Sequence, residues 1–311
     1  MPQLIHSLKE FPPTARGGAI SVGNFDGVHR GHECLIKRLV SQARHLGGKA
    51  VVFTFDPPPM AVLKPSLPLL APLTDMRRRT QLLGDLGVDV VIAYPTDIQL
   101  LELTAEQFFH QILINALGAK AIVEGPNFRF GRERLGETHL LNELCRADGI
   151  ALEIVAAKSD RDGMVSSTRI RELIVNGQLA EANALLTAPY AITGLVSHGE
   201  GRGKKLGSPT ANLTDIAVLV PKQGVYAGCV TLENCVHPAA IHIGPNPTFG
   251  EENTKVEVHI LDWHGELYED SMCCSVLQEL RSVRRFESVA ELQAQIALDI
   301  EACRTIFEAR R

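Results

Sequence analysis

With 311 residues, the chain is long enough for two domains that each bury a hydrophobic core of their own. Its 45% apolar and 22% charged residues are typical of an ordinary globular protein. The net charge of -5 argues against the broad Lys and Arg surface that binds a phosphate backbone, so we expect no nucleic-acid partner.

The cysteines and the apolar runs exclude two further classes. The seven cysteines are irregularly spaced and contain no Cys-x-x-Cys pair, so the sequence predicts neither a zinc motif nor a redox motif. The first ten residues lack the pattern of a signal peptide, and no apolar run approaches the roughly 20 residues that span a bilayer. We therefore expect a cytoplasmic protein without a membrane segment.

In the first half of the chain, short apolar runs alternate with amphipathic stretches. Strands are expected at residues 19–23, 49–55, 88–94 and 119–125, and helices at residues 32–47, 74–87 and 104–118. Gly47 and Gly48 can end the first helix, and Thr104 with Gln107 forms a capping box for the last. This rhythm predicts an open, mostly parallel Rossmann-like sheet with helices on both faces. We interpret the run Arg77 to Arg79 as a solvated helix face.

The pattern changes at Pro189 and Tyr190. Strands are expected at residues 190–198, 225–232, 239–244 and 255–262, and they are separated by Gly, Pro and Asn rather than by helices. This spacing predicts a small antiparallel β-barrel. A terminal helix should begin at Ser288, with Glu291 three residues on. Its expected apolar stripe is formed by Leu292, Ile296, Ile300 and Phe307. The predicted domains are residues 1–186 and 187–311.

The segment 23–32, GNFDGVHRGH, lies where the first strand should meet the first helix. Ligands bind at the carboxyl ends of parallel strands, and a helix N-terminus attracts phosphate. The glycines Gly23, Gly27 and Gly31 form neither a G-x-G-x-x-G fingerprint nor a Walker A loop, which disfavours a dehydrogenase or a P-loop kinase. A single histidine at such a turn is usually structural, but His29 and His32 bracket a glycine and favour a phosphate site.

Val28 to His32 resembles the His-x-Gly-His motif of the nucleotidylyltransferase superfamily. The longer run SVGNFDGVHRGH resembles its bacterial FAD synthetase branch, and SSTRIRELI from Ser166 resembles the second signature of that superfamily. The resemblance implies that His29 and His32 contact ATP phosphates and that Arg171 acts with them. It also implies that ATP or its phosphates contact Gly23, Asn24, Phe25, Asp26, Gly31, Ser167 and Thr168. The motif NFRFG implies that Asn127 binds flavin. Taken alone, SSTRIREL could simply be a capped helix with solvated arginines.

Adenylyl transfer suits these residue types. An oxygen of the FMN phosphate attacks the α-phosphorus of ATP in line, and pyrophosphate leaves. Because the nucleophile is already an anion, catalysis depends on positioning and on stabilising the charge that spreads over the phosphate oxygens.

A second motif set begins in the glycine-rich run HGEGRGKKLGSPTANL. Lys205 follows Gly203-Lys204 where a Walker A loop would have Ser or Thr, and a surface hairpin loop is the alternative interpretation. Pro209 to Asn212 resembles the Pro-Thr-Ala-Asn motif of bacterial riboflavin kinases. The resemblance implies that Thr210 and Asn212 hold Mg²⁺, that Gly201, Gly203 and Lys205 bind ATP, and that Glu257 is the base.

Strand alternation places Glu257 and His259 on one face of their strand. A base is needed in this domain because riboflavin presents a neutral 5'-hydroxyl. A glutamate on the solvent face of a strand is the alternative interpretation.

Taken together, these motifs resemble the bacterial bifunctional riboflavin kinase/FAD synthetase family over nearly the whole chain. The resemblance implies riboflavin, FMN and ATP as substrates and Mg²⁺ as cofactor. The chain departs from the family at Pro58, where a histidine is usual, and at Ser208, where an apolar residue is usual. An enzyme with one of the two activities, or a flavin-binding regulator without turnover, therefore remains an alternative. The sequence does not indicate an oligomeric state.

Overall fold

The computed structural model describes residues 1–66, 70–197, 208–233, 235–245, 254–263, 265, 267 and 270–310. The chain forms two compact units, one of Met1–Leu70 with Met76–Ser166 and one of Ala71–Asp75 with Ser167–Arg311. This division groups two helices that follow Ser166 with the barrel. A domain boundary at residue 186 stays a prediction.

The first unit contains a six-stranded parallel sheet, in the order β1-β4-β3-β2-β5-β8. The strands are β1 Gln3–Ile5, β2 Ala19–Val22, β3 Ala50–Phe55, β4 Val90–Tyr94, β5 Ala121–Glu124 and β8 Ala151–Ile154. The chain order reverses at β2, because β3 and β4 lie on one side of it and β5 and β8 on the other. The carboxyl ends of β2 and β5 therefore form the topological switch point, where such sheets bind ligands.

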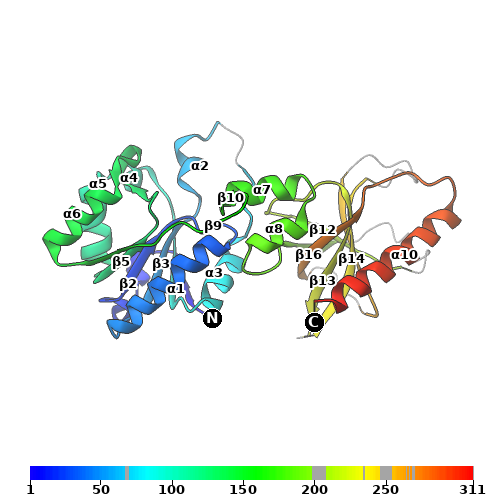
Figure 1. Ribbon diagram of the computed structural model, residues 1–311, viewed down its shortest axis with the longest axis horizontal. Helices are drawn as coiled ribbons and strands as arrows, with labels where there is room; N and C mark the ends of the chain where they lie inside the picture. Colours follow the sequence, from blue (N-terminus) through cyan, green and yellow to red (C-terminus); the bar gives the residue numbers. More distant parts are fainter. Residues whose placement is uncertain are drawn as a thin grey trace. The chain divides into compact units, whose positions relative to one another are not determined.

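Helices cover both faces of this sheet, as the sequence predicts (Figure 1). The helices that precede β4 in the chain are α1 Arg30–His45, α2 Pro59–Leu63 and α3 Met76–Asp85. The helices that follow β4 are α4 Ile98–Glu102, α5 Ala105–Gln107, η3 Phe108–Ala116 and α6 Thr138–Asp148. The predicted capping box of Thr104 and Gln107 is confirmed, but the helix continues from α5 into the π-helix η3. The predicted end of α1 is also confirmed, because Gly47 is left-handed at φ 65 and donates to Arg44.

Short elements complete the first unit. They are the 3-10 turns η1 Leu8–Glu10, η2 Pro13–Ala15 and η4 Arg132–Arg134, and the hairpin strands β6 Arg129–Phe130, β7 Gly136–Glu137, β9 Ser159–Asp160 and β10 Gly163–Met164. Among the residues that the structure describes, no helix is long and apolar enough to cross a membrane.

The second unit is a closed antiparallel barrel, in the order β11-β12-β15-β14-β13-β16, which confirms the predicted fold. The strands are β11 Ala191–Ser197, β12 Ala211–Thr214, β13 Gly224–Leu232, β14 Cys235–Gly244, β15 Lys255–Ile260 and β16 Ser271–Arg281. Two helices precede it, α7 Ser167–Val175 and α8 Leu179–Leu185. The Asn183 side chain ties α8 to the barrel, since it donates to the carbonyls of Val276 and Leu277 and accepts from the Tyr190 N–H.

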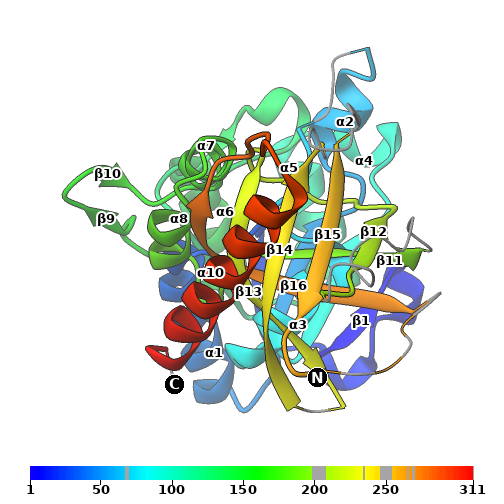
Figure 2. The same cartoon turned by 90° about the vertical axis from the view of Figure 1, so that its right-hand side faces the viewer.

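The terminal helix α10, Val289–Glu308, packs across β13 and β14 (Figure 2). Its start is as predicted, because the Ser288 hydroxyl accepts from the Glu291 N–H at 3.2 Å. The predicted apolar stripe is only half-buried, and the helix residues that are fully buried are Asp299 and Cys303. A polar contact therefore lies at the centre of the buried face.

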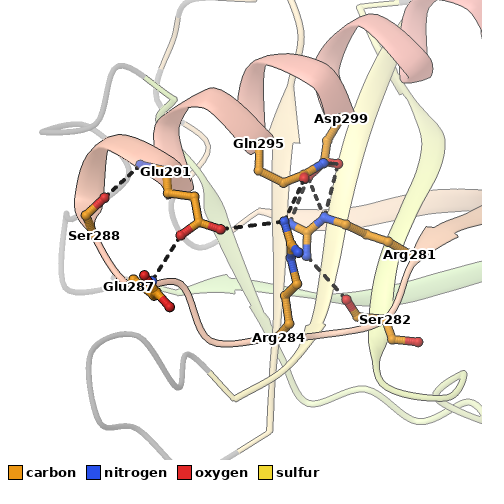
Figure 3. Close-up of polar contacts among 8 residues, drawn as sticks. All are labelled: Arg281, Ser282, Arg284, Glu287, Ser288, Glu291, Gln295 and Asp299. Atoms are coloured by element: carbon orange, nitrogen blue, oxygen red, sulfur yellow. Dashed lines mark hydrogen bonds and ion pairs between the residues drawn. The ribbon is translucent and has the colours of Figure 1, made fainter.

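That contact is a bidentate ion pair between Asp299 and Arg281 at the end of β16 (Figure 3). Arg281 Nε lies 3.1 and 3.0 Å from the two carboxylate oxygens, and Nη2 lies 2.8 Å from Oδ2. Gln295 also donates to this carboxylate at 2.9 Å. Because Asp299 is only 6% exposed, loss of either partner would leave a buried charge without its counterion.

We predict that Asp299→Ala lowers the free energy of unfolding of the second unit by about 3 to 5 kcal/mol. Glu291→Gln is the matched control, since Glu291 pairs with Arg284 at 3.8 Å in an exposed contact and should cost less than about 1 kcal/mol. Urea unfolding of both variants measures the difference. Equal losses of stability would contradict the assigned role of the buried pair.

Candidate active sites

The turn between β2 and α1 holds a strained backbone. Phe25 and Val28 have positive φ values of 47 and 39, and Gly27 has a φ of 80. Left-handed conformations are uncommon for residues other than glycine and exceptional for a β-branched residue such as Val28. Each costs roughly 1 to 3 kcal/mol, so the surroundings must hold the turn in place.

A buried ion pair is one of the contacts that hold it. Arg79 of α3 places Nη2 3.0 Å from Oδ1 of Asp26, and the two residues are 4% and 7% exposed. The interpretation of the run Arg77 to Arg79 as a solvated face is thus wrong for Arg79. This guanidinium is a partner of Asp26, and a contact of Asp26 with ATP stays a prediction.

The neighbouring strands hold the turn from two sides. Gly23 donates its N–H to the carbonyl of Phe53 on β3 at 3.0 Å. Val22 donates its N–H to Oε1 of Glu124 on β5 at 2.6 Å. The Thr54 hydroxyl donates to the carbonyl of Asn24 at 3.2 Å. Contacts within the protein itself therefore hold the predicted ATP-site segment in place.

His29 is the N-cap of α1. Its Nδ1 accepts the N–H of His32 at 3.2 Å. In a neutral imidazole, one ring nitrogen accepts and the other carries the hydrogen. The cap therefore places the hydrogen of neutral His29 on Nε2, which is a hydrogen-bond donor at the start of the helix.

The two imidazoles lie stacked, with ring centroids 3.6 Å apart and an interplanar angle of 14°. Burial lowers the pKa of His29 from 6.5 to about 4, against the opposing charge of Asp26. Burial, with additional effects of His29 and Arg79, lowers the pKa of His32 well below 6.5. Both rings are therefore neutral at pH 7 in the free protein and act as hydrogen-bonding groups rather than as fixed cations.

Gly31 is required by the same packing. A Cβ at this position would lie 3.0 Å from two atoms of the His29 ring and 3.4 Å from the Val165 carbonyl. A larger residue would push the His29 imidazole out of place. The glycine between the two histidines thus serves the placement of the His29 ring.

One ring nitrogen of His32 is buried without a described hydrogen-bond partner. Its Nδ1 has no hydrogen-bond partner among the residues that the structure describes. A buried polar atom of this kind is rare in native structures and often marks a functional group. It supports a ligand site at the start of α1.

Other predicted residues of this site lie in varied surroundings. Asn24 and Asn127 are exposed, and Asn127 Nδ2 contacts the Met164 sulfur at 4.0 Å. Ser167, Thr168 and Arg171 belong to α7 of the second unit, where Arg171 Nε donates to the Ala71 carbonyl at 3.3 Å. Their roles toward ATP and flavin stay predictions.

The second candidate site lies on the barrel. The register aligns Ser197, Asn212, Glu257 and His242 on four adjacent strands, β11, β12, β15 and β14. Asn212 and Glu257 are therefore direct cross-strand neighbours on one face, whereas Val256, Val258 and Ile260 are buried on the other. The predicted alternation of β15 is confirmed.

A cavity of about 750 Å³ lies beside this row, lined by Ser197, Asn212, Thr214 and Lys255 among others. The predicted phosphate-binding residues Gly201, Gly203 and Lys205 lie outside the described residues. Thr210 is half-buried, and the carbonyl of the preceding residue, Pro209, accepts from His259 Nδ1 at 2.8 Å. The imidazole of His259 thus ties the Pro-Thr-Ala-Asn motif to β15.

The two positions at which the sequence departs from the family pattern are not fully buried. Pro58 is exposed and is the N-cap residue of α2, where it makes no side-chain capping bond. Ser208 is half-buried, next to the Pro-Thr-Ala-Asn motif. Neither residue takes part in the contacts described above.

Three residues of these sites were missed by the sequence analysis. Arg79 looks like surface charge, and Glu124 looks like the ordinary end of a strand. His242 is paired with Glu257 across β14 and β15, and its Nε2 lies 3.1 Å from the Pro245 carbonyl. Burial lowers the pKa of His242, while Glu257 opposes that effect. The sequence does contain a signal for His242, because strand alternation predicts that its side chain lies on the same face of the strand as Ala240.

Family models match both units. Residues 11–169 match the model described as FAD synthetase, and residues 186–307 match the model described as riboflavin kinase. The chain therefore combines, in one polypeptide, the domains of two classes of flavin-modifying enzymes.

Curated relatives have the same combination. Proteins named bifunctional riboflavin kinase/FMN adenylyltransferase from Pseudomonas fluorescens and Escherichia coli K12 are each 34% identical, and they cover 98% and 97% of this chain and 97% and 96% of their own. The Listeria monocytogenes relative is 34% identical over 93% of this chain and 92% of its own. The chain belongs to the family of bifunctional riboflavin kinase/FMN adenylyltransferases, as the sequence predicts.

A solved structure shares the fold. It is titled as a macrolide-efflux protein from Streptococcus pneumoniae, with a TM-score of 0.86, 32% identity and coverage of 97% of this chain and 98% of that chain. The three bifunctional relatives do not share this description.

The lowered pKa of His29 predicts how stability changes with pH. Between its ordinary value of 6.5 and the folded value of about 4, the unfolded chain binds a proton that the folded chain does not. The free energy of unfolding should therefore fall as the pH drops through this range, by roughly 3 kcal/mol from this residue alone.

His29→Asn keeps a side-chain acceptor at the N-cap and removes the titrating ring, so its stability should fall less between pH 6.5 and 4. Urea unfolding of both proteins across this range measures the difference. Parallel pH curves for the two proteins would show that His29 is not buried in its neutral form.

Proposed function

We propose that the chain phosphorylates riboflavin to FMN on its barrel unit and adenylylates FMN to FAD on its α/β unit, with ATP as the co-substrate of both reactions. The observation that carries the proposal is the pair of neutral, stacked imidazoles at the start of α1, at the switch point of a parallel sheet. Membership of the bifunctional family supports it for both units.

In the adenylylation, the FMN phosphate oxygen forms a bond to the α-phosphorus of ATP, the bond to the β-phosphate oxygen breaks, and pyrophosphate leaves. His29 donates its Nε2–H to a phosphate oxygen, and His32 lies stacked against it. The partial positive charge at the start of α1 adds to the attraction for phosphate. A phosphate anion close to the rings also raises their pKa values, so a proton can be taken up as charge develops.

In the kinase reaction, the riboflavin 5'-oxygen forms a bond to the γ-phosphorus of ATP, and the bond to the β-phosphate oxygen breaks, so that ADP leaves. Glu257 accepts the hydroxyl proton. Glu257 pairs with Asn212 in the barrel register, which supports the proposal of a base beside a candidate phosphate and metal ligand. Removal of that proton contributes typically 10² to 10⁴ in rate.

Mg²⁺ fits the donor set of the barrel site. Thr210 and Asn212 offer neutral oxygens. This suits Mg²⁺, which usually takes few protein ligands together with phosphates and waters. When bound, the ion would neutralise charge on the ATP phosphates. Thr210 and Asn212 would hold it through their oxygens.

A cytoplasmic location completes the proposal. All seven cysteines are free thiols, and Cys145, Cys274 and Cys303 are buried. Free thiols persist in a reducing compartment, which supports the cytoplasm. Asp26, Asn127 and Arg171 are retained as proposed contacts with ATP or flavin.

We predict that two single substitutions separate the two activities. His29→Asn should lower FAD formation from supplied FMN by about 10²-fold or more, through loss of the Nε2–H donor, and leave FMN formation unchanged. Glu257→Gln should lower FMN formation from riboflavin by about 10²-fold or more and leave FAD formation from FMN unchanged. Chromatography of both products, with ATP and Mg²⁺ supplied, measures each rate.

If the wild-type chain formed only one product, the single-activity alternative would replace this proposal. If either variant lost both activities while still folded, the two sites would not be independent. Tight flavin binding with no ATP consumption would instead favour a regulator without turnover.

A further inference from the structure

Glu124 spans the switch point between β2 and β5. The parallel ladder of these strands pairs Ala19 with Ala121 and Ile20 with Ile122, and it ends there. Two residues further on, Val22 lies opposite Glu124. At that position the Val22 N–H bonds to Glu124 Oε1 at 2.6 Å rather than to a backbone carbonyl. A hydrogen bond to a side chain thus takes the place of the next backbone hydrogen bond between the two strands.

This replacement lets β2 and β5 separate without leaving a backbone donor unpaired. Because a carboxyl reaches farther than a carbonyl, Val22 keeps a partner while the two strands no longer run at ladder distance. On the other side of β2, the next residue, Gly23, stays bonded to Phe53 of β3. The start of the strained turn is therefore tied to β3 by backbone and to β5 by the Glu124 side chain.

The surroundings of Glu124 favour a neutral acid. The residue is 2% exposed. Burial raises the pKa of its carboxyl well above the usual range, and the bond from the Val22 N–H only partly opposes that effect. The nearby Ser21 hydroxyl also acts to lower this pKa, although its Oγ does not reach hydrogen-bond geometry with any residue that the structure describes.

We propose that Glu124 is a positioning residue for adenylyl transfer, which holds the carboxyl end of β2, and with it the turn that bears Asp26, His29 and His32, through its bond to the Val22 N–H. Glu124 acts through the backbone and does not contact the reacting atoms. The inference rests on the proposed adenylyl transfer at this site.

The test compares two variants at this position. Glu124→Gln keeps a side-chain oxygen for the Val22 N–H and stays neutral. Glu124→Leu has a similar size but offers no acceptor, so the buried Val22 N–H loses its partner. Steady-state rates of FAD formation from FMN are measured for both, with riboflavin phosphorylation by the same chains as the internal control. Hydrogen exchange of the Val22 amide is followed in parallel.

We expect Glu124→Leu to lower kcat for FAD formation by about 10²-fold, the loss expected when a site moves by about 1 Å. Riboflavin phosphorylation should stay within about twofold, and the Val22 amide should exchange at least about tenfold faster. Glu124→Gln should retain FAD formation within about threefold and should keep the Val22 amide protected.

Three results would overturn the proposal. The first is that the Glu124→Leu chain still forms FAD at a rate within about threefold of wild type. The second is that the Glu124→Gln chain loses as much activity as the Glu124→Leu chain. The third is that the Glu124→Leu chain loses both activities. A wild-type chain that forms no FAD would refute the proposed function instead. The exchange of the Val22 amide would still decide whether Glu124 holds the end of β2.

Discussion

The turn that joins β2 to α1 must keep Phe25 and Val28 in left-handed conformations, and the placement of both imidazoles depends on it. Such strain persists only where the surroundings determine the backbone more strongly than its own preferences do. Here a buried ion pair holds Asp26, and a hydrogen bond to a side chain holds the Val22 N–H. A backbone hydrogen bond to the neighbouring strand holds Gly23. With the turn fixed, His29 caps α1, and the cap determines which nitrogen of its ring can donate.

The same packing sets the charges of the site. Two stacked rings could not easily carry positive charges together, and burial keeps both neutral at pH 7. The free protein therefore presents oriented hydrogen-bonding groups at the start of α1, where we propose that phosphate binds. Preorganised donors that need no rearrangement during the reaction are a large source of catalysis. The barrel site differs, because its proposed chemistry needs a base, and its register puts Glu257 next to Asn212.

Much of this could be predicted from the sequence, because periodic burial and short motifs are local signals. The parallel strands β2 to β5, the alternation of β15 and the caps at Thr104 and Ser288 all follow from residues a few positions apart. Contacts between distant segments could not be predicted. Arg79 lies 53 positions from Asp26, and Glu124 lies 102 positions from Val22, so nothing near either residue shows its partner. The burial of Asp299 within the expected apolar stripe of α10 could not be predicted either, because its partner lies on the distant strand β16.

The most direct test of the central claim is the protonation state of the two histidines. Nitrogen-15 NMR of the imidazole rings reports both charge and tautomer, and it can be recorded at pH 7 with the full chain. We predict that His29 and His32 are both neutral and that His29 has its hydrogen on Nε2. A positively charged His29 at this pH, or a hydrogen on its Nδ1, would contradict the assignment of His29 as the cap of α1 and a donor to phosphate.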